Sequence, residues 1–192
     1  GKVTPQSITA GCDKKVWWYL PYDDPITGKH FDFEWEATIS NRTNGRECPF
    51  LSGHQIWVGY NDLATTNPEI IKEWHPTKNG TITPRDVTKG SDKIIWWMCE
   101  KGHEWEETVS SRIRGRGCPY CANKRILKGF NDLETTNPNI AKEWHPTKNG
   151  KLTPEELTYA SNKKVWWLCP NGHSYEKNVA GRTLANRGCP YC

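Results

Sequence analysis

Two sets of cysteine and histidine residues recur in the chain at almost the same spacing. The first is Cys99-x3-His103-x14-Cys118-x2-Cys121, and the second is Cys169-x3-His173-x15-Cys189-x2-Cys192. Each set provides three thiols and one imidazole, the donors of a closed tetrahedral zinc site that has a structural role. A catalytic zinc would need a position open to water, and neither set indicates one. Two pairs of disulfides are the alternative, but they would not require a histidine at the same offset in both sets.

The segments that must position these ligands have little apolar material of their own. The chain has 192 residues, 35% of them hydrophobic, and a mean hydropathy of −0.83. Its apolar content is concentrated in eleven tryptophans and seven tyrosines. Units of roughly 60 residues bury too little surface to fold securely without an additional cross-link. We therefore expect two structural Zn²⁺ ions, whose binding free energy becomes part of the folding free energy.

Internal repeats divide the chain into three copies of one module. Residues 61–80 and 131–150 are identical at 17 of 20 positions, with a period of 70 residues. Residues 1–20 follow the pattern of residues 80–99, including two adjacent tryptophans, and 34–51 follow 104–121. A fixed period is typical of an array of similar units. We expect modules at residues 1–57, 58–127 and 128–192.

The first module has lost most of its metal ligands. In the aligned positions Leu20, Phe33 and Leu51 replace the first cysteine, the histidine and the last cysteine, and only Cys48 remains. Because three ligands became apolar together, we expect these three side chains to fill the volume that zinc occupies elsewhere. This module is therefore predicted to be a degenerate, metal-free copy.

An insertion lengthens the same module between Leu20 and Phe33. Its Asp-Asp-Pro-Ile-Thr-Gly sequence predicts the turn of a long β-hairpin. An altered metal site built from His30, Cys48 and His54 is the alternative for this module. Cys12 aligns with a serine of the second module and is expected to be an ordinary free thiol.

The strands and turns around the ligands are readable from the residue types. Residues 93–99 and 164–169 are β-branched and aromatic, which predicts strands, and 103–112 alternates enough to be a partner strand. The turn between them contains Gly102, which would give the backbone freedom that a metal knuckle needs. Each hairpin should therefore present the first cysteine and the histidine of a set at its tip.

Helices are predicted around the hairpins. Residues 67–74 and 137–144 begin with Asn-Pro, a helix start with Asn67 or Asn137 as the cap. Residues 122–129 follow the last ligand pair and are expected to start another short helix.

The adjacent tryptophans must face opposite sides of their strand. One member of each pair should pack under the hairpin, and a neighbouring helix should cover the other, unless it is left available for base stacking. Trp74 and Trp144 end the predicted helices and are expected to lie in the core. The pairs are Trp96 with Trp97 and Trp166 with Trp167.

The combined motifs NDLxTTNPxIxxEWHPTKNG, WWxC, GHxW and RGCPYC cover almost the whole chain. They resemble a tandem family of treble-clef, or zinc-ribbon, zinc-finger domains. The resemblance implies small α+β modules, each stabilised by zinc, with members attached to nuclease-like or other nucleic-acid proteins. It implies one zinc at each of the two Cys-His sets, and none in the first module, which departs from the motif.

A basic segment, residues 110–128, is the most suggestive functional feature. It has no acidic residue, and arginines spaced by two on an extended segment would point the same way, toward a phosphate backbone. The formal charge of +4 falls to about +2 with both sites loaded, so charge alone does not identify the partner. An acidic strand, with Glu104 and Glu106, lies just upstream and weakens this interpretation. The nucleic-acid-binding candidates are Arg112, Arg114, Arg116, Lys124, Arg125, Arg182 and Arg187.

Recognition rather than catalysis is the expected function. Glu73, His75 and Asn79 could suggest a nuclease, but there is no convergent set of metal-binding carboxylates and histidines. A histidine that bonds the backbone in a Pro76-containing turn is the simpler reading of His75 and of its counterpart His145. We expect no enzyme activity and no small-molecule substrate.

The favoured partner is nucleic acid, DNA above all. The alternative partner is a protein, with the array acting as a scaffold that positions a catalytic domain elsewhere. The chain carries no signal peptide and no apolar run of membrane-spanning length. With thiols committed to metal, it is expected to be an intracellular part of a larger protein, in the cytoplasm, nucleoid or nucleus.

Overall fold

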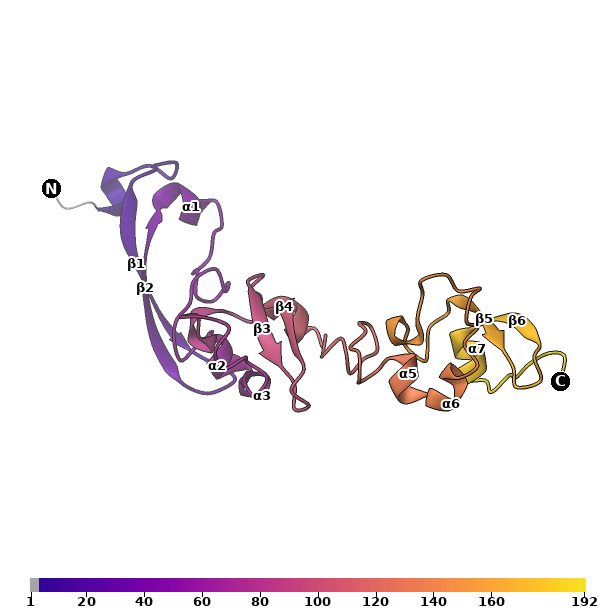
Figure 1. Ribbon diagram of the computed structural model, residues 1–192. Coiled ribbons are helices and arrows are strands. Elements are labelled where there is room, and N and C mark those ends of the chain that lie inside the picture. The colour runs from indigo at the N-terminus through magenta and orange to yellow at the C-terminus, as the bar shows by residue number, and fades with distance from the viewer. Residues whose placement is uncertain (1–3) are drawn as a thin grey trace. The chain divides into compact units, whose positions relative to one another are not determined.

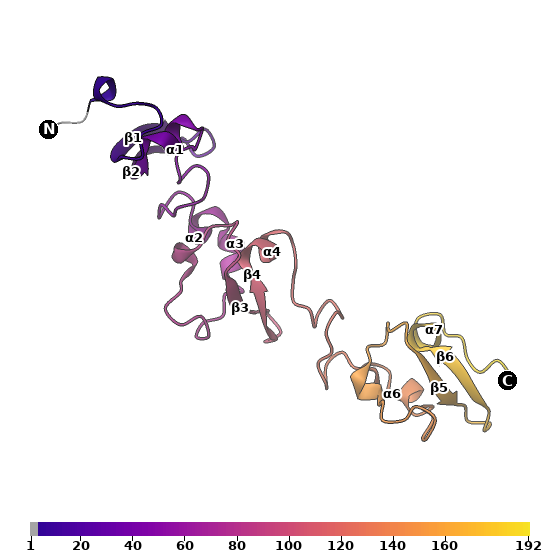
Figure 2. The ribbon, with the colours of Figure 1, turned by 90° about the horizontal axis from the view of Figure 1, so that it is seen from above.

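The computed structural model describes residues 4–192 as three small α+β modules built on two-stranded antiparallel hairpins (Figures 1 and 2). This confirms the fold class expected from the sequence. Every helix in residues 4–192 is far too short to cross a bilayer. The hairpins are β1 (Lys15–Asp23) with β2 (His30–Thr38), β3 (Ile94–Met98) with β4 (Glu104–Thr108), and β5 (Lys164–Leu168) with β6 (Ser174–Asn178).

A five-residue helix follows each hairpin directly. In the second module β4 ends at Thr108, whose hydroxyl accepts a hydrogen bond from the Ser111 N–H at 3.2 Å. This side-chain cap starts a helix where the sequence predicted that the strand would continue to residue 112. The three helices are α1 (Ile39–Thr43), α4 (Val109–Ile113) and α7 (Val179–Thr183).

The helices predicted at residues 67–74 and 137–144 are present but shorter, and another helical turn precedes each of them. Asp62 caps the first of these turns, because its carboxylate accepts a hydrogen bond from the Thr65 N–H at 3.0 Å. The same carboxylate also accepts from the Gly59 N–H at 2.6 Å. Asn67 occupies the cap position of the second turn but makes no capping bond through its side chain. The turns are α2 (Leu63–Thr66), α3 (Pro68–Ile71), α5 (Leu133–Thr136) and α6 (Pro138–Ala141). Single 3-10 turns also occur at Pro5–Ser7, Pro84–Asp86 and Pro154–Glu156.

The helix predicted at residues 122–129 is absent, and the segment forms consecutive turns. Asn131 holds these turns in place. Its side-chain amide donates to the carbonyls of Tyr120 and Arg125 at 2.9 and 2.8 Å, and its oxygen accepts from the Leu127 N–H at 2.7 Å. An amide that satisfies three backbone groups competes with regular helical bonding.

One tryptophan of each adjacent pair forms the core of its module. Trp97 is fully buried and its ring meets Trp74 edge-on, with centroids 5.4 Å apart. Trp96, on the opposite face, is half-buried, and the Lys78 ammonium lies 4.4 Å from its ring centroid. The division of the pair between two faces is thus confirmed, but the turn after α3 covers the outer ring, not a helix.

The first module has a core of closely packed aromatic rings where the other modules have their Cys-His sets. Phe33, at the position of the ligand histidine, is completely buried. Its ring centroid lies 5.1–5.3 Å from those of Phe50, Trp57 and Tyr60. Aromatic pairs at these separations contribute packing beyond their buried area.

Leu51 does not take part in this packing, contrary to the sequence prediction. Its side chain is 37% exposed, whereas the neighbouring Phe50 is buried and Leu20 packs against the cluster. The aligned ligand candidate Cys121 is also exposed, so this position lies on the outer side of the module. An apolar side chain at that outer position remains in solvent, and the aromatic ring beside it fills the interior.

The long hairpin of the first module places His30 between two carboxylates. Its Nδ1 lies 2.6 Å from Asp23 and its Nε2 lies 3.3 Å from Asp32. The hydrogen bond to Asp23, followed by that to Asp32, raises the pKa of His30 above its usual value.

We expect the NMR titration of His30 to have its midpoint above about 6.5, and Asp23→Asn to lower that midpoint. Any stabilisation from this contact is complete below the unfolded-state pKa and is lost as pH rises through the folded-state pKa. A midpoint that Asp23→Asn leaves unchanged would contradict the contact.

Candidate metal centres

The four ligand candidates of the second module converge on one point. The Nδ1 atom of His103 lies 3.5, 3.6 and 3.3 Å from the sulfurs of Cys99, Cys118 and Cys121. The sulfurs of Cys99 and Cys121 are 4.0 Å apart. All four donor atoms lie within 4.8 Å of one another, although they come from the hairpin tip and from a loop about 15 residues further on.

The third module repeats this arrangement. The Nδ1 atom of His173 lies 3.6, 3.7 and 3.4 Å from the sulfurs of Cys169, Cys189 and Cys192. The sulfurs of Cys169 and Cys192 are 3.7 Å apart. Their donor atoms also lie within 4.8 Å of one another.

These separations fit a tetrahedral zinc ion. With Zn–S bonds of about 2.3 Å and Zn–N bonds of about 2.05 Å, tetrahedral angles give edges of about 3.8 Å for S···S and about 3.6 Å for S···N. The observed 4.0 and 3.7 Å for S···S, and 3.3–3.7 Å for S···N, agree with those edges. They exclude a disulfide between Cys99 and Cys121, or between Cys169 and Cys192, because an S–S bond is about 2.05 Å long.

The hairpin tip prepares the first cysteine for metal binding. Gly102 and Gly172 have positive φ values of 79° and 83°, as expected for a knuckle glycine. The backbone N–H of His173 donates to the Cys169 sulfur at 3.3 Å. Burial raises the pKa of the Cys169 thiol, but hydrogen bonds from the backbone of His173 and Asn171 outweigh it and lower that pKa to about 7. The thiolate, which is the ligand form, is therefore favoured.

An aromatic cover over the second site was not found from the sequence. Phe130 meets the His103 ring edge-on, with centroids 4.1 Å apart, and the Tyr120 ring centroid lies 5.8 Å from that of His103. The repeat could have indicated this ring, because Phe130 follows the aromatic Tyr60 by one period of 70 residues. Tyr60 packs on Phe33 as Phe130 packs on His103. The imidazole of one module and the phenyl ring of the other thus occupy equivalent surroundings.

The alternative metal site in the first module does not form. His30 is engaged with Asp23 and Asp32, and His54 hydrogen-bonds the Ser52 hydroxyl at 3.1 Å. Over residues 4–192, only the two Cys-His sets bring three or more donors together.

The family comparison agrees with the two centres and with the repeats. A family described as a probable treble clef zinc finger domain matches residues 1–53, 70–124 and 140–192. The chain belongs to this family. It is therefore a tandem array of treble-clef modules, and its two Cys-His centres are compatible with zinc. No curated protein matches the chain.

Two of the seven basic candidates are internal parts of their treble-clef modules. Arg112 is buried, its Nη2 lies 2.7 Å from the Glu73 carboxylate, and its guanidinium covers the Trp97 ring. Arg182 is likewise buried against Glu143. The helix α4 turns Arg112 inward, where the extended segment expected from the sequence would have pointed it outward. These two arginines hold hairpin and turn segment together and are not available to a phosphate.

The other basic candidates lie at the surface of the treble-clef modules. The Arg114 guanidinium donates to the Ser110 hydroxyl at 3.4 Å, but its side chain is exposed. The exposed candidates are Arg114, Arg116, Lys124, Arg125 and Arg187.

The histidine that the second and third modules share has a structural role in its turn. The Nδ1 of His75 accepts hydrogen bonds from the N–H groups of Thr77 and Lys78 at 3.3 and 3.2 Å. His145 does the same for Thr147 and Lys148, both at 3.3 Å. The turn interpretation of these histidines is confirmed.

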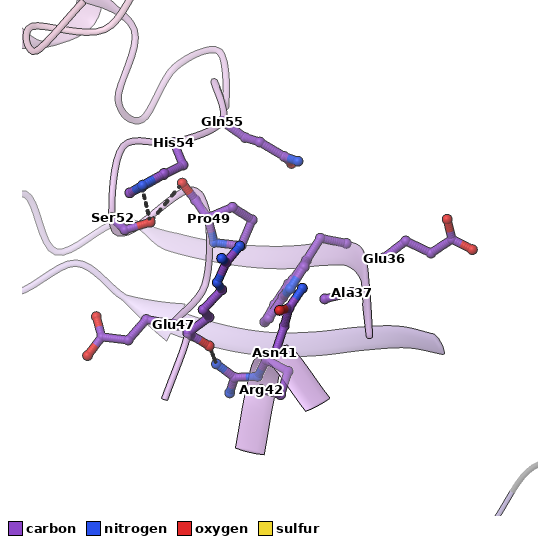
Figure 3. A pocket seen from close by; sticks show the side chains of 11 residues that line it. Glu36, Ala37, Asn41, Arg42, Glu47, Pro49, Ser52, His54 and Gln55 are labelled. Atoms are coloured by element: carbon purple, nitrogen blue, oxygen red, sulfur yellow. Dashed lines mark hydrogen bonds between the residues drawn. The ribbon is translucent and has the colours of Figure 1, made fainter. Parts of the chain in front are cut away.

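An open cavity of about 600 Å³ lies in the first module beside α1 (Figure 3). Trp35, Arg42, Arg46, Glu47 and His54 are among the residues around it. At its edge the Arg42 guanidinium donates to the Arg46 carbonyl at 2.5 Å.

Proposed function

We propose that this array is a binding protein that contacts the phosphate backbone of a nucleic acid, duplex DNA above all. One observation carries the proposal. Residues 114–125 contain four exposed basic side chains and no acidic residue, and they include the ligands Cys118 and Cys121. A bound metal would fix this loop, so the basic groups would meet phosphates from a preorganised backbone. We propose no catalytic activity for it.

Backbone contact, rather than base reading, suits the short elements. Sequence readout in the major groove uses a helix or a two-stranded ribbon with base-reading side chains. The longest helices in residues 4–192 have five residues, and the arginines lie on loops around the ligands. Arginine side chains on a loop suit phosphate oxygens, which carry no sequence information.

Neutralising the basic loop should abolish most of the binding. The variant carries Arg114→Gln, Arg116→Gln, Lys124→Gln and Arg125→Gln, and duplex affinity is measured by fluorescence anisotropy at several salt concentrations. Each lost phosphate contact should reduce the slope of log K against log salt by about 0.9. Four contacts would therefore reduce it by roughly 3.6.

A matched control removes the same charge from positions outside the basic loop. It carries Lys14→Gln, Lys15→Gln, Lys29→Gln and Lys89→Gln, all at exposed positions. This control should keep most of the duplex affinity. Equal losses in both variants would mean that net charge, not the basic loop, drives binding.

A protein-interaction or scaffolding array is the second candidate function. Arg112 and Arg182 favour this candidate, because both form internal ion pairs. Less positive charge is therefore left at the surface to bind phosphates. Absence of duplex binding even at low salt would favour this candidate over the first.

A further inference from the structure

The cavity of the first module is bordered by a small residue where the other two modules have a long side chain. In every module the indole of the second tryptophan in β1, β3 or β5 donates to the carbonyl of this position, at 3.0–3.1 Å. The three positions are therefore structurally equivalent. They are Ala37 in the first module, Glu107 in the second and Lys177 in the third.

The long side chain of the third module crosses the corresponding space. The Lys177 ammonium donates to the carbonyls of Arg187 and Gly188 at 3.4 and 3.3 Å. These two residues align with Arg46 and Glu47, which border the cavity of the first module. An alanine side chain cannot reach them, so the space between β2 and the residues after α1 stays open.

The opening lies away from the side of the hairpin that the preceding turn segment covers. In the second module that segment bonds Trp96 of β3, the first strand. The cavity of the first module instead lies beside β2, the second strand, and residues 46–55. The binding groups assigned below exclude Arg42 and Trp35, because their counterparts contact the glutamate of a turn segment.

Two side-chain amides border the cavity without a partner. Asn41 belongs to α1 and Gln55 to the loop on the other side, as Figure 3 shows. Neither amide makes a hydrogen bond within residues 4–192. The aligned residues of the second module are Ser111 and Arg125, so this amide pair does not recur there. A primary amide presents a donor beside an acceptor, which matches the N6 and N7 edge of adenine.

Arg46 supplies a positive charge to the same cavity. Its guanidinium is exposed and forms no ion pair within residues 4–192. Two carboxylates also stand at the edge, those of Glu36 and Glu47, but Figure 3 shows both directed away from the cavity. A phosphate group can therefore approach Arg46 without meeting a carboxylate.

We propose that this cavity binds one unpaired nucleotide of a nucleic acid, with adenine preferred. The base lies against Ala37 and Pro49, the amides of Asn41 and Gln55 bond its edge, and Arg46 binds its phosphate. A volume of about 600 Å³ is within the range of small-ligand sites. The inference rests on the proposed nucleic-acid function, and it adds to the backbone contacts a site for a base that has left the stack.

Titration with adenosine 5′-monophosphate, followed by NMR on the intact, zinc-loaded chain, tests the cavity directly. We expect saturable shifts at the backbone amides of Ala37 and Gln55. Ala37→Lys should weaken binding at least about tenfold, because the lysine would cross the cavity as Lys177 does. The third module already carries this lysine, so the fold should tolerate it. Ala10→Lys is the matched control at an exposed position outside the cavity, and it should change the affinity less than about twofold.

Two further variants separate the phosphate from the base. Arg46→Gln should weaken adenosine monophosphate at least about fivefold and leave adenosine unaffected. Gln55→Ala should weaken both ligands at least about threefold. Inorganic phosphate that binds as tightly as the nucleotide would show a site for anions alone and overturn the proposal.

A duplex with one unpaired adenine links the cavity to the nucleic acid. It should bind at least about fivefold more tightly than the fully paired duplex, and Ala37→Lys should remove only this difference. No nucleotide binding at about 10 mM, or a preference that survives Ala37→Lys, would overturn the cavity assignment while paired-duplex binding still supported the proposed function. Nucleotide binding without any duplex binding would instead overturn the proposed function and, with it, a nucleic acid as the source of the nucleotide.

Discussion

Removing zinc with a chelator is expected to unfold the second and third modules and to leave the first folded. Apparent binding free energies of structural zinc are about 10–16 kcal/mol, which exceeds what a module of this size can store in its core. The first module has an aromatic cluster around Phe33 at the equivalent position. Backbone NMR resolves the outcome, with Trp97 and Trp167 reporting on the metal modules and Trp35 on the first. Native mass spectrometry of the untreated chain should show two zinc ions.

Single ligand variants separate metal binding from general destabilisation. Cys121→Ser should unfold the second module, because a hydroxyl replaces one of four donors. Cys12→Ser is the matched control, since Cys12 lies outside both donor sets and should have no such effect. Loss of the Trp35 signals on chelation, together with those of Trp97, would show that the first module also depends on metal.

The sequence predicted the two Cys-His clusters and the hairpins well because the information that specifies them is local. A ligand pair with three intervening residues and a glycine fits a tight knuckle, and Gly102 indeed has the positive φ that this knuckle needs. Because successive side chains of a strand face opposite sides, the sequence also predicted that the adjacent Trp96 and Trp97 lie on opposite faces. Both inferences need only neighbours along the chain.

Contacts between distant residues were the ones that the sequence concealed. Arg112 was interpreted as a phosphate ligand because it belongs to a run of basic residues. In the structure it instead pairs with Glu73, which lies 39 residues away in the sequence. The helix start at Thr108 changes which way the arginine points, and a side-chain cap of this kind is a weak signal in an alternating sequence. Repeats offered one clue, since Arg182 and Glu143 have the same separation.

The assignment of Leu51 to the core went wrong for a related reason. The alignment of Leu51 with Cys121 identifies equivalent backbone positions. It does not establish that the two side chains point in the same direction. A cysteine at that position needs only to bring one sulfur to the metal, whereas burial of a leucine requires the whole side chain to turn inward. Phe50, aligned with Tyr120, was already directed toward the cluster and took that volume.

Truncating the central ring of the first module should destabilise it severely. Phe33→Ala removes a completely buried phenyl ring that contacts Phe50, Trp57 and Tyr60. Deleting such a ring costs about 3–5 kcal/mol, through lost transfer free energy and the cavity that remains. A module of this size has only about 3–5 kcal/mol to lose, so it should unfold at room temperature. Denaturant unfolding followed through the Trp35 resonance gives the change in free energy.

Leu51→Ala is the matched control, because the same alignment suggested the same burial. Its exposed side chain should cost less than about 1 kcal/mol. Added zinc should rescue neither variant, since Cys48 is the one ligand that the first module retains. Equal losses for Phe33→Ala and Leu51→Ala, or recovery of Phe33→Ala with zinc, would mean that the aromatic cluster is not what replaces the metal. A large loss of folding free energy for Phe33→Ala alone would support packed aromatic rings as the feature that stabilises the first module, where the other two modules have their Cys-His sets.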